Sequence, residues 1–226
     1  MNSPTIGVLK MILADLRTSF YVILSILLVI YVTLTVIALR VVDGEVTVGG
    51  LSPLHIYMFV IGIAGFKETL AYALGMSVRR TDYFRGVLIA GFGTAAVSSF
   101  AITLLSEAES AVFAQFDLQV KVFHLIGFES VGTAGRWLAN FIFHSFEYVL
   151  GFMFALLYKR FGAIGLYVLV GAFLLAAALA HLLDGWGPVF VWLGSLNDGL
   201  EAALWLLPLL AFNIVVSYAL IRRVTV

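Results

Sequence analysis

Long runs of apolar residues, separated by short polar stretches, dominate the chain. Six of these runs are close to 20 residues long, about the length that an α-helix needs to cross the hydrocarbon core of a bilayer. We therefore predict an all-α, polytopic membrane protein in which residues 1–226 form a single transmembrane domain. The six expected transmembrane helices lie at about residues 20–39, 53–74, 86–106, 137–158, 161–183 and 201–221.

Composition strengthens this prediction. Hydrophobic residues make up 62% of the chain and charged residues 12%, against roughly 45–50% and about 25% in soluble domains. A soluble fold cannot bury that much apolar surface, so the composition excludes a soluble enzyme, a nucleic-acid-binding protein and a disordered chain. Cysteine is absent, which excludes disulfides, thiolate metal sites and thiol nucleophiles.

The distribution of basic residues predicts the orientation. Membrane proteins concentrate Lys and Arg in their short cytoplasmic loops. Nine basic residues fall on one predicted face and three (Arg40, Lys121 and Arg136) on the other. We therefore expect a multi-pass protein of the cell membrane with both termini in the cytoplasm. The nine are Lys10, Arg17, Arg79, Arg80, Arg85, Lys159, Arg160, Arg222 and Arg223.

Three segments outside these spans also show structure-forming patterns. Residues 3–19 place apolar side chains at three- and four-residue steps, which predicts an amphipathic helix on the cytoplasmic surface; the alternative is the end of a long first helix. Residues 107–135 predict an external amphipathic helix. Residues 185–199 are apolar but short and interrupted by Gly and Pro, which favours a re-entrant segment over an ordinary outer loop.

A short basic and aromatic turn follows the second predicted span. We expect that span to end at Gly75, because glycine commonly terminates helices, and Thr81-Asp82 to cap the next helix. Positive-inside anchoring explains the arginines, but it does not explain the aromatic residues, which we expect to be exposed. The side chains concerned are Arg79, Arg80, Tyr83, Phe84 and Arg85.

This turn resembles one found in the membrane subunits of bacterial ABC transporters of the second exporter type. The family shows a Gly-x-Ser-Arg-Arg/Lys-x-x-Phe/Tyr-Phe-like turn between spans two and three. Here one extra residue separates the serine from the first arginine. The family also has six spans, an interfacial helix before the first span and re-entrant helices between the last two. The turn in this chain reads Gly75-Met76-Ser77-Val78-Arg79-Arg80-Thr81-Asp82-Tyr83-Phe84.

The resemblance implies a permease subunit that exports a lipophilic or peptide-like cargo. In the family, the turn is the coupling helix that docks into a groove of the ATPase. It also implies three partners: a nucleotide-binding ATPase, a second permease protomer of the same or another chain, and the lipid bilayer. The coupling residues would be Gly75, Ser77, Arg79, Arg80, Asp82, Tyr83, Phe84 and Arg85.

We expect the energy source to lie on the partner. The chain has no Gly-x-x-x-x-Gly-Lys-Ser/Thr phosphate-binding loop, so ATP and Mg²⁺ are expected on the ATPase subunit. No cofactor, metal or catalytic residue is expected on this chain.

Ionisable residues within predicted spans are functional candidates because they are costly to bury in a bilayer. Lys67 and Glu68 lie near the cytoplasmic end of the second span. The sequence leaves two roles open for them, a function in gating and structural anchoring. His144 and Glu147 are three residues apart and so share a helix face. His181 is the only nearby candidate for a third metal ligand.

The remaining histidines, His55 and His124, are expected to be ordinary residues of the outer surface.

Two other functions are open alternatives. An intramembrane hydrolase would use His144, Glu147 and His181, but the Glu-Glu-x-x-x-Arg motif of prenyl-protein proteases is missing. A substrate-binding membrane subunit of a vitamin-uptake system would need a small-residue face on the first span, which is instead crowded with large side chains.

Overall fold

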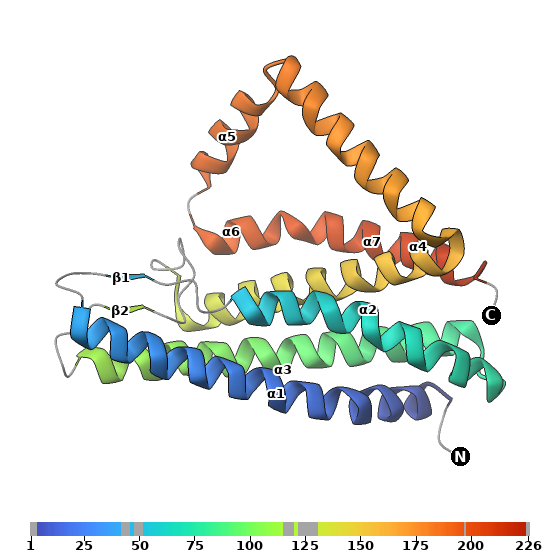
Figure 1. The fold of residues 1–226 in the computed structure, drawn as a ribbon, viewed down its shortest axis with the longest axis horizontal. Coiled ribbons are helices and arrows are strands. Elements are labelled where there is room, and N and C mark those ends of the chain that lie inside the picture. Colours follow the sequence, from blue (N-terminus) through green and yellow to red (C-terminus); the bar gives the residue numbers. More distant parts are fainter. Residues whose placement is uncertain are drawn as a thin grey trace.

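A computed structural model describes residues 4–41, 46–47, 52–114, 120–121, 131–196 and 198–224. Helices dominate the described residues, and the only strands among them form one two-residue parallel pair (Figure 1). In chain order the elements are α1 (Pro4–Val41), β1 (Val46–Thr47), α2 (Ser52–Gly75), α3 (Arg80–Ala114), β2 (Val120–Lys121), α4 (Thr133–Leu182), α5 (Trp186–Ser195), α6 (Gly199–Leu204) and α7 (Leu206–Ile221).

Five helical segments of the described chain are long and apolar enough to cross a membrane. Helices α1, α2 and α3 contain the first three predicted spans. The last predicted span, 201–221, corresponds to α6 and α7 together. The predicted spans 137–158 and 161–183 both lie in α4, which is one helix of 50 residues. The all-helical architecture is therefore confirmed, although six separate long helices are not observed.

The predicted surface helix at 3–19 is wrong as a separate element. Helix α1 runs without a break from Pro4 to Val41, so the alternative of one long first helix holds. Val8, Ile12, Leu16, Ile23 and Leu27 are all buried along it. Their spacing continues one apolar stripe through residue 20, so the chain has no local reason to bend there.

Helix α4 bends at Gly162, whose φ of 66° and ψ of −163° lie outside the helical region. Glycine tolerates such a backbone because it has no Cβ. Beyond this bend the chain leaves the bundle, reverses after Leu182 and returns through α5 (Figure 1). We call residues 163–196 the arm. Helix α5 lies within the segment predicted to be re-entrant, and its ten residues are too few to cross a bilayer. Its placement relative to a membrane stays a prediction.

The predicted external helix at 107–135 is also wrong in part. Helix α3 continues to Ala114, and Val120–Lys121 pairs with Val46–Thr47 as strand. Residues 115–119 and 122–130 lie outside the described residues. Arg136, at the start of α4, forms an ion pair with Glu107 near the end of α3.

Helices α2 and α4 run side by side with their backbones in close contact. A methyl group added at Gly62 would collide with the Tyr148 carbonyl oxygen, and one added at Gly151 would collide with the Phe59 carbonyl oxygen. Small residues at such crossings let helix backbones approach closely. Around this contact lies the main core cluster, to which α1, α3 and α7 also contribute.

We expect Gly62→Ala to lower the free energy of unfolding by about 1–3 kcal/mol or more, because the new methyl group overpacks a backbone contact. Gly65→Ala is the matched control on the same helix, since nothing lies within 4 Å of its added Cβ. The control should be neutral or raise stability by about 0.5–1 kcal/mol through helix propensity. Thermal or denaturant unfolding of the purified variants measures both. Equal stability of the two variants would contradict the close helix contact.

Candidate functional site

The α2–α3 turn is a defined structure that ends α2 at Gly75, as predicted. Val78 N–H donates to the Ala73 carbonyl at 3.1 Å and Ser77 N–H to the Leu74 carbonyl at 3.0 Å. This is a Schellman arrangement, which requires a left-handed residue at its centre. That residue is Ser77, with φ of 59°, and not Gly75.

The prediction that Tyr83 and Phe84 are exposed is wrong. Tyr83 is 0% exposed, and its hydroxyl lies 2.7 Å from Thr69 Oγ1 on α2. Phe84 is buried and its ring packs on those of Phe152 and Tyr218, with centroids 6.1 and 5.4 Å apart. Helix α3 begins at Arg80, one to two residues before the predicted cap, and both aromatic side chains pack inward from its start. They anchor the turn and cannot dock a partner.

Other members of the predicted coupling set remain accessible. Gly75, Ser77, Arg79 and Arg85 are exposed, as is Met76 between the first two.

Arg80 is half-buried, and its Nη1 donates to the Arg222 carbonyl at 2.8 Å, which ties the turn to the end of α7. Asp82 is half-buried in the first turn of α3, where a carboxylate interacts favourably with the helix dipole.

Arginines of the α2–α3 turn, of the α4 bend and of the segment after α7 gather at one end of the bundle. Figure 1 places both termini, the α2–α3 turn and the bend of α4 at this end. Gly86 packs against Val8, which brings α1 to the start of α3. A groove of about 570 Å³ opens here between α4 and α7, and its lining includes Arg160, Arg222 and Arg223.

A second polar group lies inside the bundle toward the opposite end of α2. His144 is 0% exposed, and its Nδ1 lies 3.0 Å from Ser98 Oγ on α3. His55 Nδ1 is 2.8 Å from Glu147 Oε1. The rings of His55 and His144 have centroids 4.9 Å apart. The predicted shared face of His144 and Glu147 therefore holds, and α2 supplies its partner.

The third residue of this group is His55 and not His181, which the sequence had suggested. His181 is exposed in the arm, whereas His55, expected to be an ordinary surface residue, pairs with Glu147. A histidine in the first turn of an apolar helix was the only available signal. His124 and the side chains of Lys67 and Glu68 lie outside the described residues.

His55, His144 and Glu147 could hold a metal ion. One ligand atom from each lies within 4.8 Å of those of the other two. Among the described residues, none supplies a hydrogen-bond partner to His55 Nε2, His144 Nε2 or Glu147 Oε2, although all three atoms are buried. Each buried polar atom without a partner lowers the stability of the fold by about 1–3 kcal/mol. The three residues therefore do not fully satisfy one another's hydrogen bonds.

Comparison with known proteins adds no assignment: no family model, curated protein or solved structure matches the chain.

We expect Ser98→Ala to lower the free energy of unfolding by about 1–3 kcal/mol, because it leaves the buried His144 Nδ1 without its partner. Ser99→Ala is the matched control, since Ser99 is equally buried and, among the described residues, its hydroxyl donates only to the Ala96 carbonyl of its own helix. That change should cost under about 0.5 kcal/mol. Denaturant unfolding measures the stability of both variants. An equal loss of stability in the two would show that the serine–histidine contact does not stabilise the fold.

Proposed function

We propose that the protein spans the cell membrane with both termini in the cytoplasm. The long apolar helices support the membrane location. The collection of the termini, the α2–α3 turn and the basic groove at one end supports the orientation, because cytoplasmic surfaces are enriched in Lys and Arg.

We further propose that it is the permease subunit of an ATP-driven transporter, with ATP and Mg²⁺ on a separate ATPase. The observation that carries this proposal is the α2–α3 turn. Its surface presents Met76, Arg79 and Arg85, while Tyr83 and Phe84 fix its base in the core. When a rigidly anchored turn is displaced, the helices attached to it move as well, whereas a flexible loop would change shape without moving them.

The packing supplies a route for that motion. The turn joins α2 to α3, and α2 is locked to α4 at Gly62 and Gly151. Displacement of the turn by ATPase closure would therefore move α4 and, beyond Gly162, the arm. Such movement would open a path for a lipophilic or peptide-like cargo.

Reversing two charges on the turn should weaken ATPase capture. We expect Arg79→Glu/Arg85→Glu to reduce co-purification of a nucleotide-binding ATPase from native membranes by about tenfold or more, equivalent to about 1.4 kcal/mol of binding. Lys10→Glu/Arg17→Glu reverses two exposed charges on α1 and should leave capture unchanged. Quantitative mass spectrometry of the purified complexes measures both. Absence of an ATPase from the wild-type preparation would refute the permease assignment.

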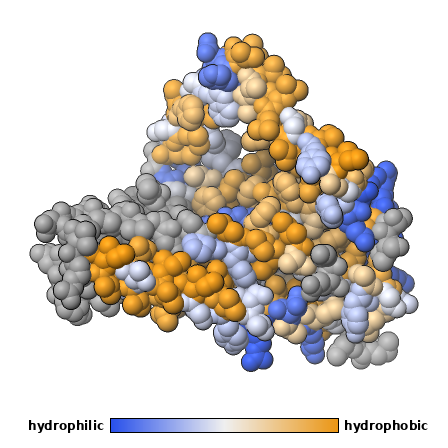
Figure 2. Space-filling view, in the orientation of Figure 1, coloured by the Kyte–Doolittle hydropathy of each residue, from blue (hydrophilic) through white to orange (hydrophobic). Residues whose placement is uncertain are grey.

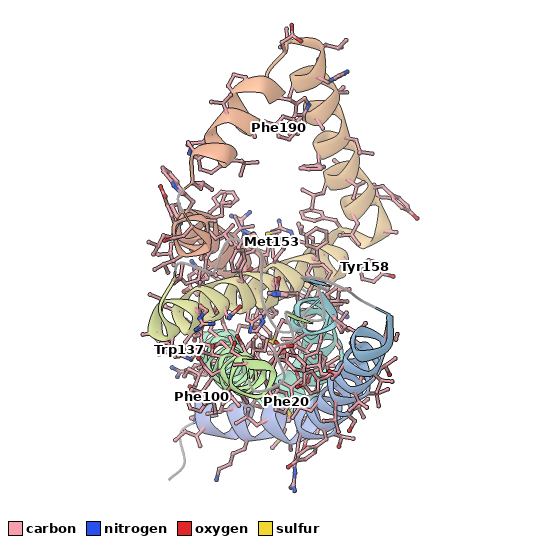
Figure 3. All side chains as sticks on the ribbon, turned by 90° about the vertical axis from the view of Figure 1, so that its left-hand side faces the viewer. Phe20, Phe100, Trp137, Met153, Tyr158 and Phe190 are labelled. Carbon is pink, nitrogen blue, oxygen red and sulfur yellow. The ribbon has the colours of Figure 1, made fainter. Side chains whose placement is uncertain are left out.

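We propose that a second copy of this chain packs against the arm. Figure 2 shows mostly apolar side chains over the visible surface of the arm, with hydrophilic residues at its tip. Figure 3 shows Phe190 on α5, well apart from Trp137 and Phe20 of the bundle. No residue of α5 is buried. The α4 part of the arm is rich in Gly and Ala, and small residues promote helix association in membranes.

Because the chain has no cysteine, single cysteines can test this contact directly. Substitution in turn at 172, 173, 174 and 175 samples every face of one helical turn. Mild oxidation in membranes should cross-link a dimer at one or two of these positions, where Cα atoms approach within about 7 Å. Val97→Cys and Phe100→Cys, exposed on α3, should remain monomeric. Failure of all four arm positions to cross-link would exclude a symmetric contact at this turn.

A further inference from the structure

The polar group formed by His55, His144 and Glu147 has the composition of a metal site rather than of a packing contact. Its members come from two helices and lie 92 residues apart in sequence at the His55–Glu147 contact. Two imidazoles and one carboxylate are the ligand set of many catalytic zinc sites and of non-haem iron sites. Ca²⁺ and Mg²⁺ prefer oxygen ligands instead.

Each of the three residues also keeps a buried atom without a hydrogen-bond partner among the described residues. These atoms are His55 Nε2, His144 Nε2 and Glu147 Oε2. Buried polar groups are normally satisfied, so three orphaned ligand atoms in one group require a common explanation. A bound cation would satisfy all three residues at once.

We propose that His55, His144 and Glu147 bind one divalent transition-metal ion of the zinc type. A tetrahedral zinc ion holds its ligand atoms about 3.3–3.4 Å apart. The present separation of up to 4.8 Å therefore has to close by about 1.4 Å, a distance within reach of side-chain rotation. The fourth position would be taken by water or by a group of the transported molecule.

The surroundings of His144 suit metal binding. Ser98 Oγ lies 3.0 Å from His144 Nδ1 and so directs the other ring nitrogen, Nε2, toward the ion. Such partners of a ligating histidine fix its tautomer and ring orientation. We assign Ser98 as a positioning residue for the site.

One edge of the site is partly exposed. The side chains of His55 and Glu147 are 18% and 22% exposed, unlike the fully buried His144. His55 lies in the first turn of α2, whereas the basic α2–α3 turn follows the last. In the proposed orientation an ion would therefore enter from the outer side. Once bound, it would fasten α2 to α4.

The test uses the full chain, purified through a histidine-free tag and stripped with a chelator. Zn²⁺ binding is measured by equilibrium dialysis with elemental analysis, and Co²⁺ substitution reports coordination through its visible spectrum. We expect one ion per wild-type chain and a four-coordinate Co²⁺ spectrum. His181→Ala is the matched control, because it removes an exposed histidine of the same helix, and it should bind like the wild type.

Variants of the ligands should lose the ion. Loss of an outer partner alone typically weakens a site by about 10–100-fold, so His55→Ala and Glu147→Gln should weaken Zn²⁺ binding by about 100-fold or more. Ser98→Ala should weaken it by about tenfold. Wild-type affinity in the ligand variants, or no stoichiometric Zn²⁺ in the wild type, would overturn the proposal.

A second measurement covers the case in which a ligand variant fails to fold. Zn²⁺ should raise the unfolding temperature of the wild-type chain, because a ligand that binds only the folded state stabilises it. Mg²⁺ at the same concentration should not. No rise with Zn²⁺, or an equal rise with both ions, would overturn the metal site. The ATPase-capture experiment is independent of either result.

Discussion

The backbone contact between α2 and α4 is the constraint on which the other features depend. Gly62 and Gly151 let the two helices approach until the carbonyls of Tyr148 and Phe59 occupy the space that side chains would fill. At this spacing Phe66 and Phe152 pack edge to face, as do Phe59 and Phe154. A larger residue at either glycine would separate both aromatic pairs together, because all of them lie along the same seam.

The same contact determines what lies at each end of α2. One end brings His55 within hydrogen-bonding distance of Glu147, which requires the helices to be close. The other end carries the turn whose base is fixed by Tyr83 and Thr69. Polar residues at both ends of an otherwise apolar helix are therefore positioned by a packing interaction in its middle. In an apolar environment such polar contacts are specific, because few alternative partners are available.

Sequence reasoning predicted the elements whose signal is local. Apolar length found the long helices, and the position of Gly75 gave the end of α2. It failed in α1, where the predicted surface helix and the first predicted span have the same helical period. The buried stripe of α1 runs through the boundary expected at residue 20. It also failed at Tyr83 and Phe84, because their burial depends on contacts with Thr69, Phe152 and Tyr218 on other helices, which the local sequence does not show.

The candidate metal site shows the other limit of prediction from sequence. His144 and Glu147 share a face by spacing alone, so the sequence identified that half of the group. The other half depends on which helix packs against α4, and the pairing of His55 with Glu147 spans 92 residues. His181 was chosen only because it is near in the predicted order of spans, but the bend at Gly162 carries it into the arm.

A single ion at one end of α2 would have a consequence for the other end. Since α2 is a continuous helix of 24 residues, a ligand that fastens His55 to α4 restricts the pivoting of the whole helix about the glycine contact. The exposed α2–α3 turn would then move α2 and α4 together rather than sliding one past the other. Metal occupancy and turn movement would therefore be mechanically coupled through one helix, although the two surfaces share no residue.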